Sequence, residues 1–70
     1  MPESVFPELS ERQAEVAELA AMGNTNAQIA DELGLEPNTV GTHIKRALKK
    51  LGLNRKGELT RMMMERTKGS

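Results

Sequence analysis

The sequence predicts an all-α fold of four short helices. No stretch alternates apolar and polar residues as a half-buried strand does, whereas four stretches repeat apolar residues at helical spacing. Gly23, Gly34 and Gly52 each follow one of the first three stretches, which is the usual place of a helix-terminating glycine. With 70 residues, the chain has the length of one small domain with a single core.

The first two helices each begin with a capping box, in which Ser or Thr is followed three residues later by Gln. The boxes are Ser10 with Gln13 and Thr25 with Gln28, and they predict helices over 11–22 and 26–33. Their apolar stripes consist of Val16, Leu19, Ala20 and Met22 in the first helix and of Ile29, Ala30 and Leu33 in the second.

Pro37 suits the first position of a third helix, because the N–H that it lacks would have no partner there. This helix is expected over 37–51. After Gly52, Leu53 turns inward and Asn54 can cap a fourth helix over 55–66. The predicted domain therefore covers 9–66, with an N-terminal tail at 1–8 and a disordered C-terminal tail at 67–70.

Composition excludes several classes of site. The chain has no cysteine and one histidine, so it can form neither a disulfide nor a metal centre, and no cofactor is expected. Phe6 is the only aromatic residue, which leaves no stacking platform for single-stranded nucleic acid. No segment is long and apolar enough to cross a membrane or act as a signal peptide, so we expect a cytoplasmic protein without a membrane partner.

The formal net charge of zero hides an uneven distribution along the chain. Up to Ile44, Arg12 is the single basic residue among eight acidic ones, whereas from Lys45 onward nine basic residues face two acidic ones. A surface that binds anions is therefore expected in the second half of the chain.

The second and third helices, joined by a short turn with Gly34, have the spacing of a helix-turn-helix. At about 100° per residue, one arc of the third helix is apolar and faces the core. That arc consists of Val40, Ile44, Ala47, Leu48 and Leu51. The opposite arc is polar and basic, with Asn38, Thr42, Lys45, Arg46 and Lys49 at its centre and Thr39, Gly41 and Lys50 toward its edges. Taken alone, such an arc could also be an ordinary solvated surface.

The polar arc of the third helix suits the major groove of duplex DNA. Asn can pair with adenine, Lys reaches guanine acceptors, and the Thr methyl can meet the thymine methyl. We expect Asn38, Thr42 and Lys45 to read bases, with Gly41 permitting close approach. The residues expected at phosphates are Thr39, Arg46, Lys49 and Lys50, together with Thr25 and Asn26 at the start of the second helix. His43, on the flank, either contacts a phosphate or packs within the domain.

Four segments, LSERQAEV (9–16), GNTNAQIA (23–30), TVGTHI (39–44) and KLGL (50–53), resemble successive motifs of the LuxR/GerE family. The resemblance extends from Leu9 to Met63 and implies a four-helix domain that reads DNA with its third helix and dimerises mainly through its fourth. Three positions depart from the family pattern: Ala27 and Gly41, where Lys is frequent, and Lys56, where Arg is frequent. The missing cations predict weaker sequence-independent affinity for DNA.

The fourth helix carries more apolar surface than an isolated domain of this size can bury. Leu59, Met62 and Met63 share one face, while Met64 points elsewhere. With the resemblance, we expect a homodimer interface made by Leu59, Met62, Met63 and Arg66. The alternative is loose core filling by adaptable methionines.

The sequence therefore predicts a bacterial or phage transcriptional regulator that binds duplex DNA, with RNA polymerase or a larger LuxR-type regulator as further partners. The promoter-reading module of a sigma factor, which residues 46–51 also resemble, fits the spacing less well. A rival of another class is a small protein that pairs through its fourth helix with a larger regulator and antagonises it. No nucleophile, base or metal site has plausible partners, so an enzyme is not expected.

Overall fold

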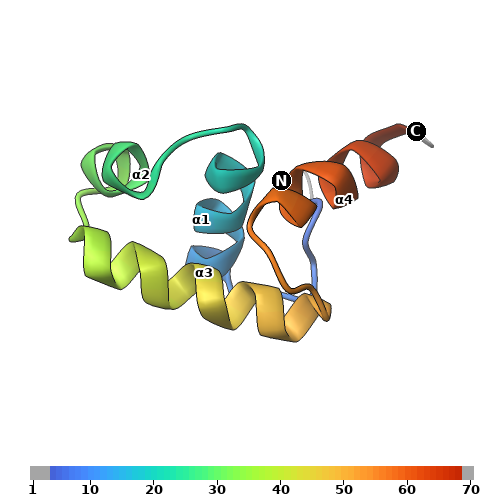
Figure 1. The fold of residues 1–70 in the computed structure, drawn as a ribbon, viewed down its shortest axis with the longest axis horizontal. Helices are drawn as coiled ribbons and strands as arrows, with labels where there is room; N and C mark the ends of the chain where they lie inside the picture. Colours follow the sequence, from blue (N-terminus) through green and yellow to red (C-terminus); the bar gives the residue numbers. More distant parts are fainter. Residues whose placement is uncertain (1–3, 69–70) are drawn as a thin grey trace.

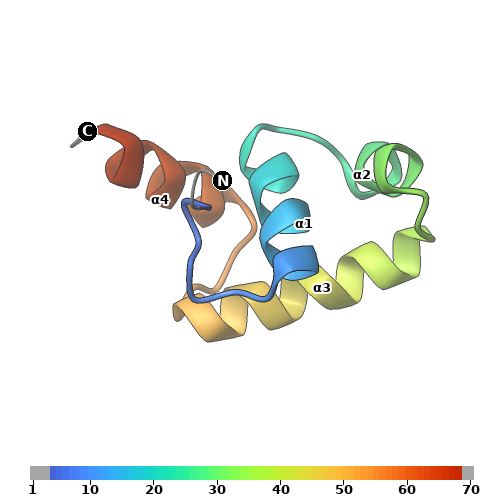
Figure 2. The same ribbon diagram turned by 180° about the vertical axis from the view of Figure 1, so that it is seen from behind.

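The protein is a four-helix domain in which the first helix packs against each of the other three. The computed structural model describes residues 4–68, and within them every regular element is an α-helix, as predicted. The helices are α1 (Glu11–Ala21), α2 (Asn26–Leu33), α3 (Pro37–Leu51) and α4 (Gly57–Lys68). α1 lies between α2 and α4, and α3 runs beneath α1 and α2 (Figures 1 and 2).

Both predicted capping boxes are present and fix the starts of α1 and α2. At α1, the Ser10 hydroxyl accepts from the Gln13 backbone N–H, and the Gln13 side chain accepts from the Ser10 N–H, both at 3.3 Å. The matching bonds between Thr25 and Gln28 at α2 are 3.1 and 2.8 Å long. Each box satisfies two backbone donors that a helix start would otherwise leave unpaired.

Glycines in left-handed conformations end α2 and α3 as expected. Gly34 and Gly52 have φ of 67° and 72°, a region that residues with a Cβ rarely adopt. After each glycine, the next backbone N–H returns to a helical carbonyl, from Leu35 to Ala30 and from Leu53 to Leu48, both at 2.8 Å. These bonds turn the two leucines back toward the core, where they are half-buried.

α4 differs from the prediction at both ends. It begins at Gly57 rather than at 55, because the preceding residues form turns in which Glu58 and Leu59 bond to carbonyls three residues back. Asn54 does not cap it through its side chain: its backbone N–H donates to the Glu58 carboxylate at 3.1 Å. Residues 67 and 68, expected in a disordered tail, belong to the helix, whereas 69 and 70 lie outside the described residues.

The core consists of one cluster drawn from all four helices and the N-terminal segment. Its members are Phe6, Leu9, Ala14, Val16, Ala17, Ala20, Ala21, Ile29, Ala30, Val40, Ile44, Ala47 and Leu59. The apolar arcs predicted for the first three helices face this cluster, with one exception: Met22, expected on the apolar stripe, is 70% exposed because the helix has already ended there.

No helix within residues 4–68 is long and apolar enough to span a membrane.

The segment before α1, expected as a tail, packs against the domain from residue 4 onward; residues 1–3 lie outside the described part. Phe6 has no exposed surface and fills the core. Arg66 of α4 closes over this segment, donating to the Val5 carbonyl at 2.8 Å and to both carboxylate oxygens of Glu8 at 2.8 and 2.7 Å. Its guanidinium lies 5.9 Å from the centre of the Phe6 ring. The two ends of the described chain are thereby tied together.

Gly41 lies on the side of α3 that faces α2. A Cβ built at this position would have the Asn26 side-chain Nδ2 as its nearest neighbour, at 3.8 Å, which is ordinary van der Waals contact. Its backbone φ is not positive, so an alanine can adopt the same conformation.

We therefore expect Gly41→Ala to stabilise the protein by about 0.5–1 kcal/mol, because glycine within a helix loses more backbone entropy on folding than alanine does. Urea denaturation followed by circular dichroism measures the difference. A destabilised variant would show that the contact between α2 and α3 tolerates no added methyl group.

The bond between Glu8 and Arg66 should make stability depend on pH in the acid range. Hydrogen bonds from the Arg66 guanidinium lower the pKa of Glu8 from its ordinary 4.5 to about 2. The folded state thus favours the ionised carboxylate, so this stabilisation is present above pH 4.5 and is lost as the pH falls toward 2. We expect Glu8→Gln to lower the melting temperature at pH 7 and to melt like the native sequence near pH 2. An equal difference at both pH values would contradict the assignment.

Candidate nucleic-acid interface

One face of α3 carries the polar and basic side chains that the sequence assigned to DNA. Seven of the predicted residues are exposed there: Asn38, Thr39, Thr42, Lys45, Arg46, Lys49 and Lys50. The apolar arc on the other side of the helix is fixed by burial of Val40, Ile44 and Ala47. Because the core determines how α3 is rotated about its axis, the basic face has to point outward.

The cations of this face are not neutralised within the protein. In residues 4–68 the ion pairs join Arg12 to Glu15, Arg61 to Glu65 and Arg66 to Glu8, and none involves α3. Four positive charges are therefore available to an external anion within about two turns of one helix.

Asn38 and Thr42 lie one turn apart on the exposed face. The Thr42 hydroxyl donates to the Asn38 backbone carbonyl at 3.1 Å, so its donor is used within the helix while its methyl group remains free. The Asn38 side chain has no hydrogen-bond partner within the described chain, which leaves both its donor and its acceptor for a ligand.

Three predicted contact residues, Asn26, Gly41 and His43, are half-buried and so less accessible than the rest. Gly41 is half-buried beside Asn26 and lies toward the edge of the face rather than at its centre. His43 is half-buried, and its Nδ1 atom is enclosed without a hydrogen-bond partner. Only the other ring nitrogen, Nε2, remains to reach an external group.

The start of α2 offers backbone donors close to this face. Thr25 uses its hydroxyl to cap Gln28, and the N–H groups of Asn26 and Ala27 make no hydrogen bond within the described residues. The Asn26 amide oxygen accepts a hydrogen bond from the Lys56 ammonium at 3.1 Å. Lys56 was not among the residues predicted for the site. The only hint in the sequence is that Lys56 stands at a position where Arg is frequent in the family that the chain resembles.

The four residues predicted for dimerisation occupy different environments. Leu59 is wholly buried in the core, and a side chain with no exposed surface cannot contact a partner, so this assignment is corrected. Met62 and Met63 are half-buried and pack against the core, and Arg66 is held by Glu8. The amphipathic pattern could not separate these roles, because a face that packs on the domain looks the same as one that packs on a partner.

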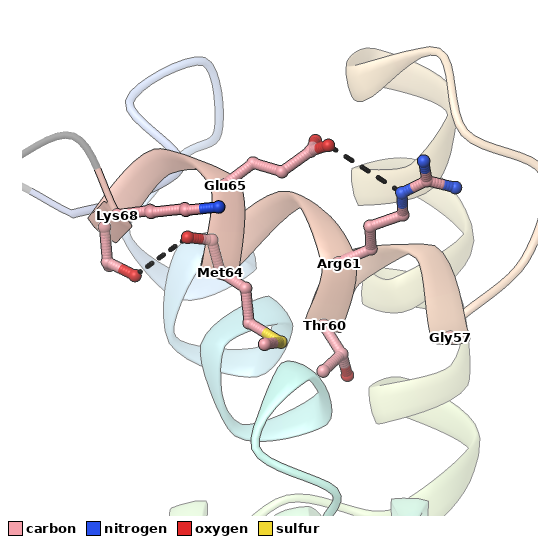
Figure 3. A pocket seen from close by; sticks show the side chains of 7 residues that line it. Gly57, Thr60, Arg61, Met64, Glu65 and Lys68 are labelled. Carbon is pink, nitrogen blue, oxygen red and sulfur yellow. Dashed lines mark hydrogen bonds and ion pairs between the residues drawn. The ribbon is translucent and has the colours of Figure 1, made fainter.

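The exposed apolar side chain of α4 is that of Met64, which is not one of the four residues predicted for dimerisation. An open hollow there is lined by residues from Gly57 to Lys68, with Met64 65% exposed (Figure 3). Arg61 and Glu65 form an exposed ion pair at 3.7 Å beside it. Thr60 points to the same side as Met64 and donates to the Ala21 carbonyl of α1 at 2.7 Å.

Comparison with known proteins places this arrangement in a family. The chain is 42% identical over 57 residues to the transcriptional regulatory protein UhpA of Escherichia coli K12, across 81% of this chain and 29% of UhpA. It is 44% identical over 50 residues to the probable transcriptional regulatory protein NarL of Mycobacterium tuberculosis, across 71% of this chain and 23% of NarL. It thus spans less than a third of either regulator.

A shorter relative is the spore germination protein GerE of Bacillus subtilis, 43% identical over 47 residues, which cover 67% of this chain and 64% of GerE. No solved structure matches the chain significantly. The family described as bacterial regulatory proteins of the luxR family matches residues 7–63, which include all of α1, α2 and α3 and the start of α4. The chain therefore belongs to the luxR family of bacterial regulatory proteins and carries the helix-turn-helix DNA-binding domain of that family.

Proposed function

We propose that this domain binds duplex DNA sequence-specifically by placing α3 in the major groove, and that it acts as a homodimer. The observation that carries the first part is the exposed face of α3, where the amide of Asn38 and four unpaired cations share one side of a helix. An α-helix fits the width of the major groove, and these side chains match its donors and acceptors.

In this proposal, Asn38, Thr42 and Lys45 read bases. Asn38 and Thr42 lie in the first half of α3, the part that enters the groove in helix-turn-helix proteins, and Lys45 lies just past the middle of the helix. Thr42 offers a methyl group to thymine because its hydroxyl donor is already used, and each well-paired side chain supplies about 1–3 kcal/mol of discrimination.

Phosphate contacts come from both sides of the groove. Arg46, Lys49 and Lys50 lie along the second half of α3 and supply positive charge. The free N–H groups at the N-terminus of α2 donate to a phosphate of the DNA backbone. Thr39 in the first turn of α3 and Thr25 at the N-cap of α2 are proposed to add further phosphate contacts. Such contacts set the register of the protein on DNA and carry little sequence information.

The homodimer would form through the outward side of α4 rather than through the face that carries Leu59. Met64 supplies exposed apolar surface, and Arg61 and Glu65 supply opposite charges. A two-fold interface brings each residue against the same patch of the other copy, so a patch that carries both charges can pair with itself. The two copies of α3 would then lie about 34–36 Å apart on DNA.

Selection of duplexes from a random library tests the mode of DNA recognition. We expect an enriched site with two-fold symmetry, and at least about tenfold weaker binding by Asn38→Ala, Thr42→Ala or Lys45→Ala. Lys49→Ala should weaken binding to all sequences equally and reduce the salt slope by about 0.9. Arg12→Gln, which removes a cation from α1, is the matched control. Binding without enrichment would contradict sequence-specific reading by α3.

Met64→Glu tests the dimer surface and the antagonist alternative together. A charge on the exposed apolar patch should shift sedimentation from dimer to monomer and weaken binding to the symmetric site while leaving half-site affinity unchanged. If the native chain binds no DNA at low salt, but pairs with a larger LuxR-type regulator in a way that Met64→Glu abolishes, the exposed patch serves an antagonist instead. Met22→Glu, at a methionine that is exposed on another part of the surface, is the control.

A further inference from the structure

The Lys56 side chain crosses the domain between two connections that are far apart in sequence. It lies in the turn that leads into α4, and its ammonium reaches the connection between α1 and α2. There it donates to the Asn24 carbonyl and to the Asn26 amide oxygen, both at 3.1 Å. The Lys56 residue is half-buried, so these bonds are partly shielded from water.

The first acceptor belongs to a turn that is held by hydrogen bonds. Asn24 bonds twice to the Leu19 carbonyl at the end of α1, through its backbone N–H at 3.2 Å and its side-chain Nδ2 at 2.9 Å. Lys56 is therefore attached to a well-held segment, and its ammonium has a defined position rather than that of a mobile surface charge.

The second acceptor belongs to the helix-turn-helix itself. Asn26 is the first residue of α2, and its Nδ2 is the atom nearest to the open side of Gly41 on α3. With its oxygen held by Lys56, the Asn26 amide has its nitrogen directed to α3. The Asn26 side chain thus belongs to α2 and lies beside Gly41 of α3, at the junction of the two helices of the DNA-binding unit.

α2 has few other attachments. It packs mainly on α3 and much less on α1, and it has no substantial contact with α4. Within residues 4–68, the bond from Lys56 to Asn26 is the only side-chain hydrogen bond that joins α2 to another helix or connection outside its own capping box. The first turn of α2 therefore depends on Lys56 for its polar anchoring.

We propose that Lys56 is a positioning residue for DNA binding. By holding the Asn26 amide, it fixes the first turn of α2 against α3, so that the free N–H groups of this turn meet a DNA phosphate in register with α3. The inference rests on the proposed function, since it concerns the phosphate site at the start of α2. Two of the three ammonium donors point into the protein, so Lys56 acts through Asn26 and does not serve as a phosphate ligand.

The test measures affinity for the selected duplex in single and double variants of Lys56 and Asn26 and in one control variant. Lys56→Met keeps the aliphatic stem and removes the ammonium, and we expect about tenfold weaker binding with an unchanged salt slope. Lys56→Arg, which keeps the charge and the donors, should restore most of the affinity. In a chain that already carries Asn26→Ala, adding Lys56→Met should lower the affinity for the duplex only slightly further. Arg55→Gln removes the neighbouring cation and should leave affinity unchanged.

A second readout works without DNA. The side-chain amide resonance of Asn26 should shift in Lys56→Met and remain in place in Arg55→Gln, with folding of each variant verified by circular dichroism. If Lys56→Met proves unfolded, Asn26→Ala alone must reproduce the tenfold loss. Native affinity in Lys56→Met, full additivity with Asn26→Ala, or a salt slope reduced by about 0.9 would each overturn the proposal. Failure of the native protein to bind any duplex would instead overturn the proposed function.

Discussion

Burial of the small apolar face of α1 against α3 is the interaction on which the rest of the structure depends. α1 contributes four alanines and one valine to the core, and α3 contributes Val40, Ile44 and Ala47. Small side chains let the two helices approach closely, and Leu59, Ile29 and Phe6 from other parts of the chain complete the cluster. Since the core permits one rotation of α3, the same burial determines which of its residues face outward. The site is therefore a consequence of packing.

Local signals were sufficient for α1, α2 and α3 because the structures that begin and end these helices are local too. A capping box spans four residues, and a left-handed glycine acts on the turn that it follows. The exposed face of α3 could be predicted for the same reason: the helical period alone separates Asn38 and Lys45 from Val40 and Ile44. The bounds of these helices and the exposure of this face agree with the sequence-based expectations.

Contacts between distant residues account for the differences. Phe6 and Glu8 looked like part of a tail because the sequence around them has no periodicity, and their partner Arg66 lies about sixty residues away. Leu59 and Met64 belong to one amphipathic helix, yet one is in the core and the other at the surface. Lys56 is separated from Asn24 and Asn26 by some thirty residues. No pattern within a window of one or two turns can reveal such pairs.

The division of charge between the two halves of the chain also affects how the protein would approach DNA. With a formal net charge of zero, the domain has no net charge that attracts a polyanion at long range, but the cations on α3 and the carboxylates on α1 and α2 lie on different helices and give it a dipole. A dipole orients a molecule only near its target, within roughly the 8 Å Debye length of physiological salt. Encounters with the acidic side would be repelled, and few would persist on unrelated sequence. Such a protein gains discrimination during its search for a site at the expense of a slower association rate.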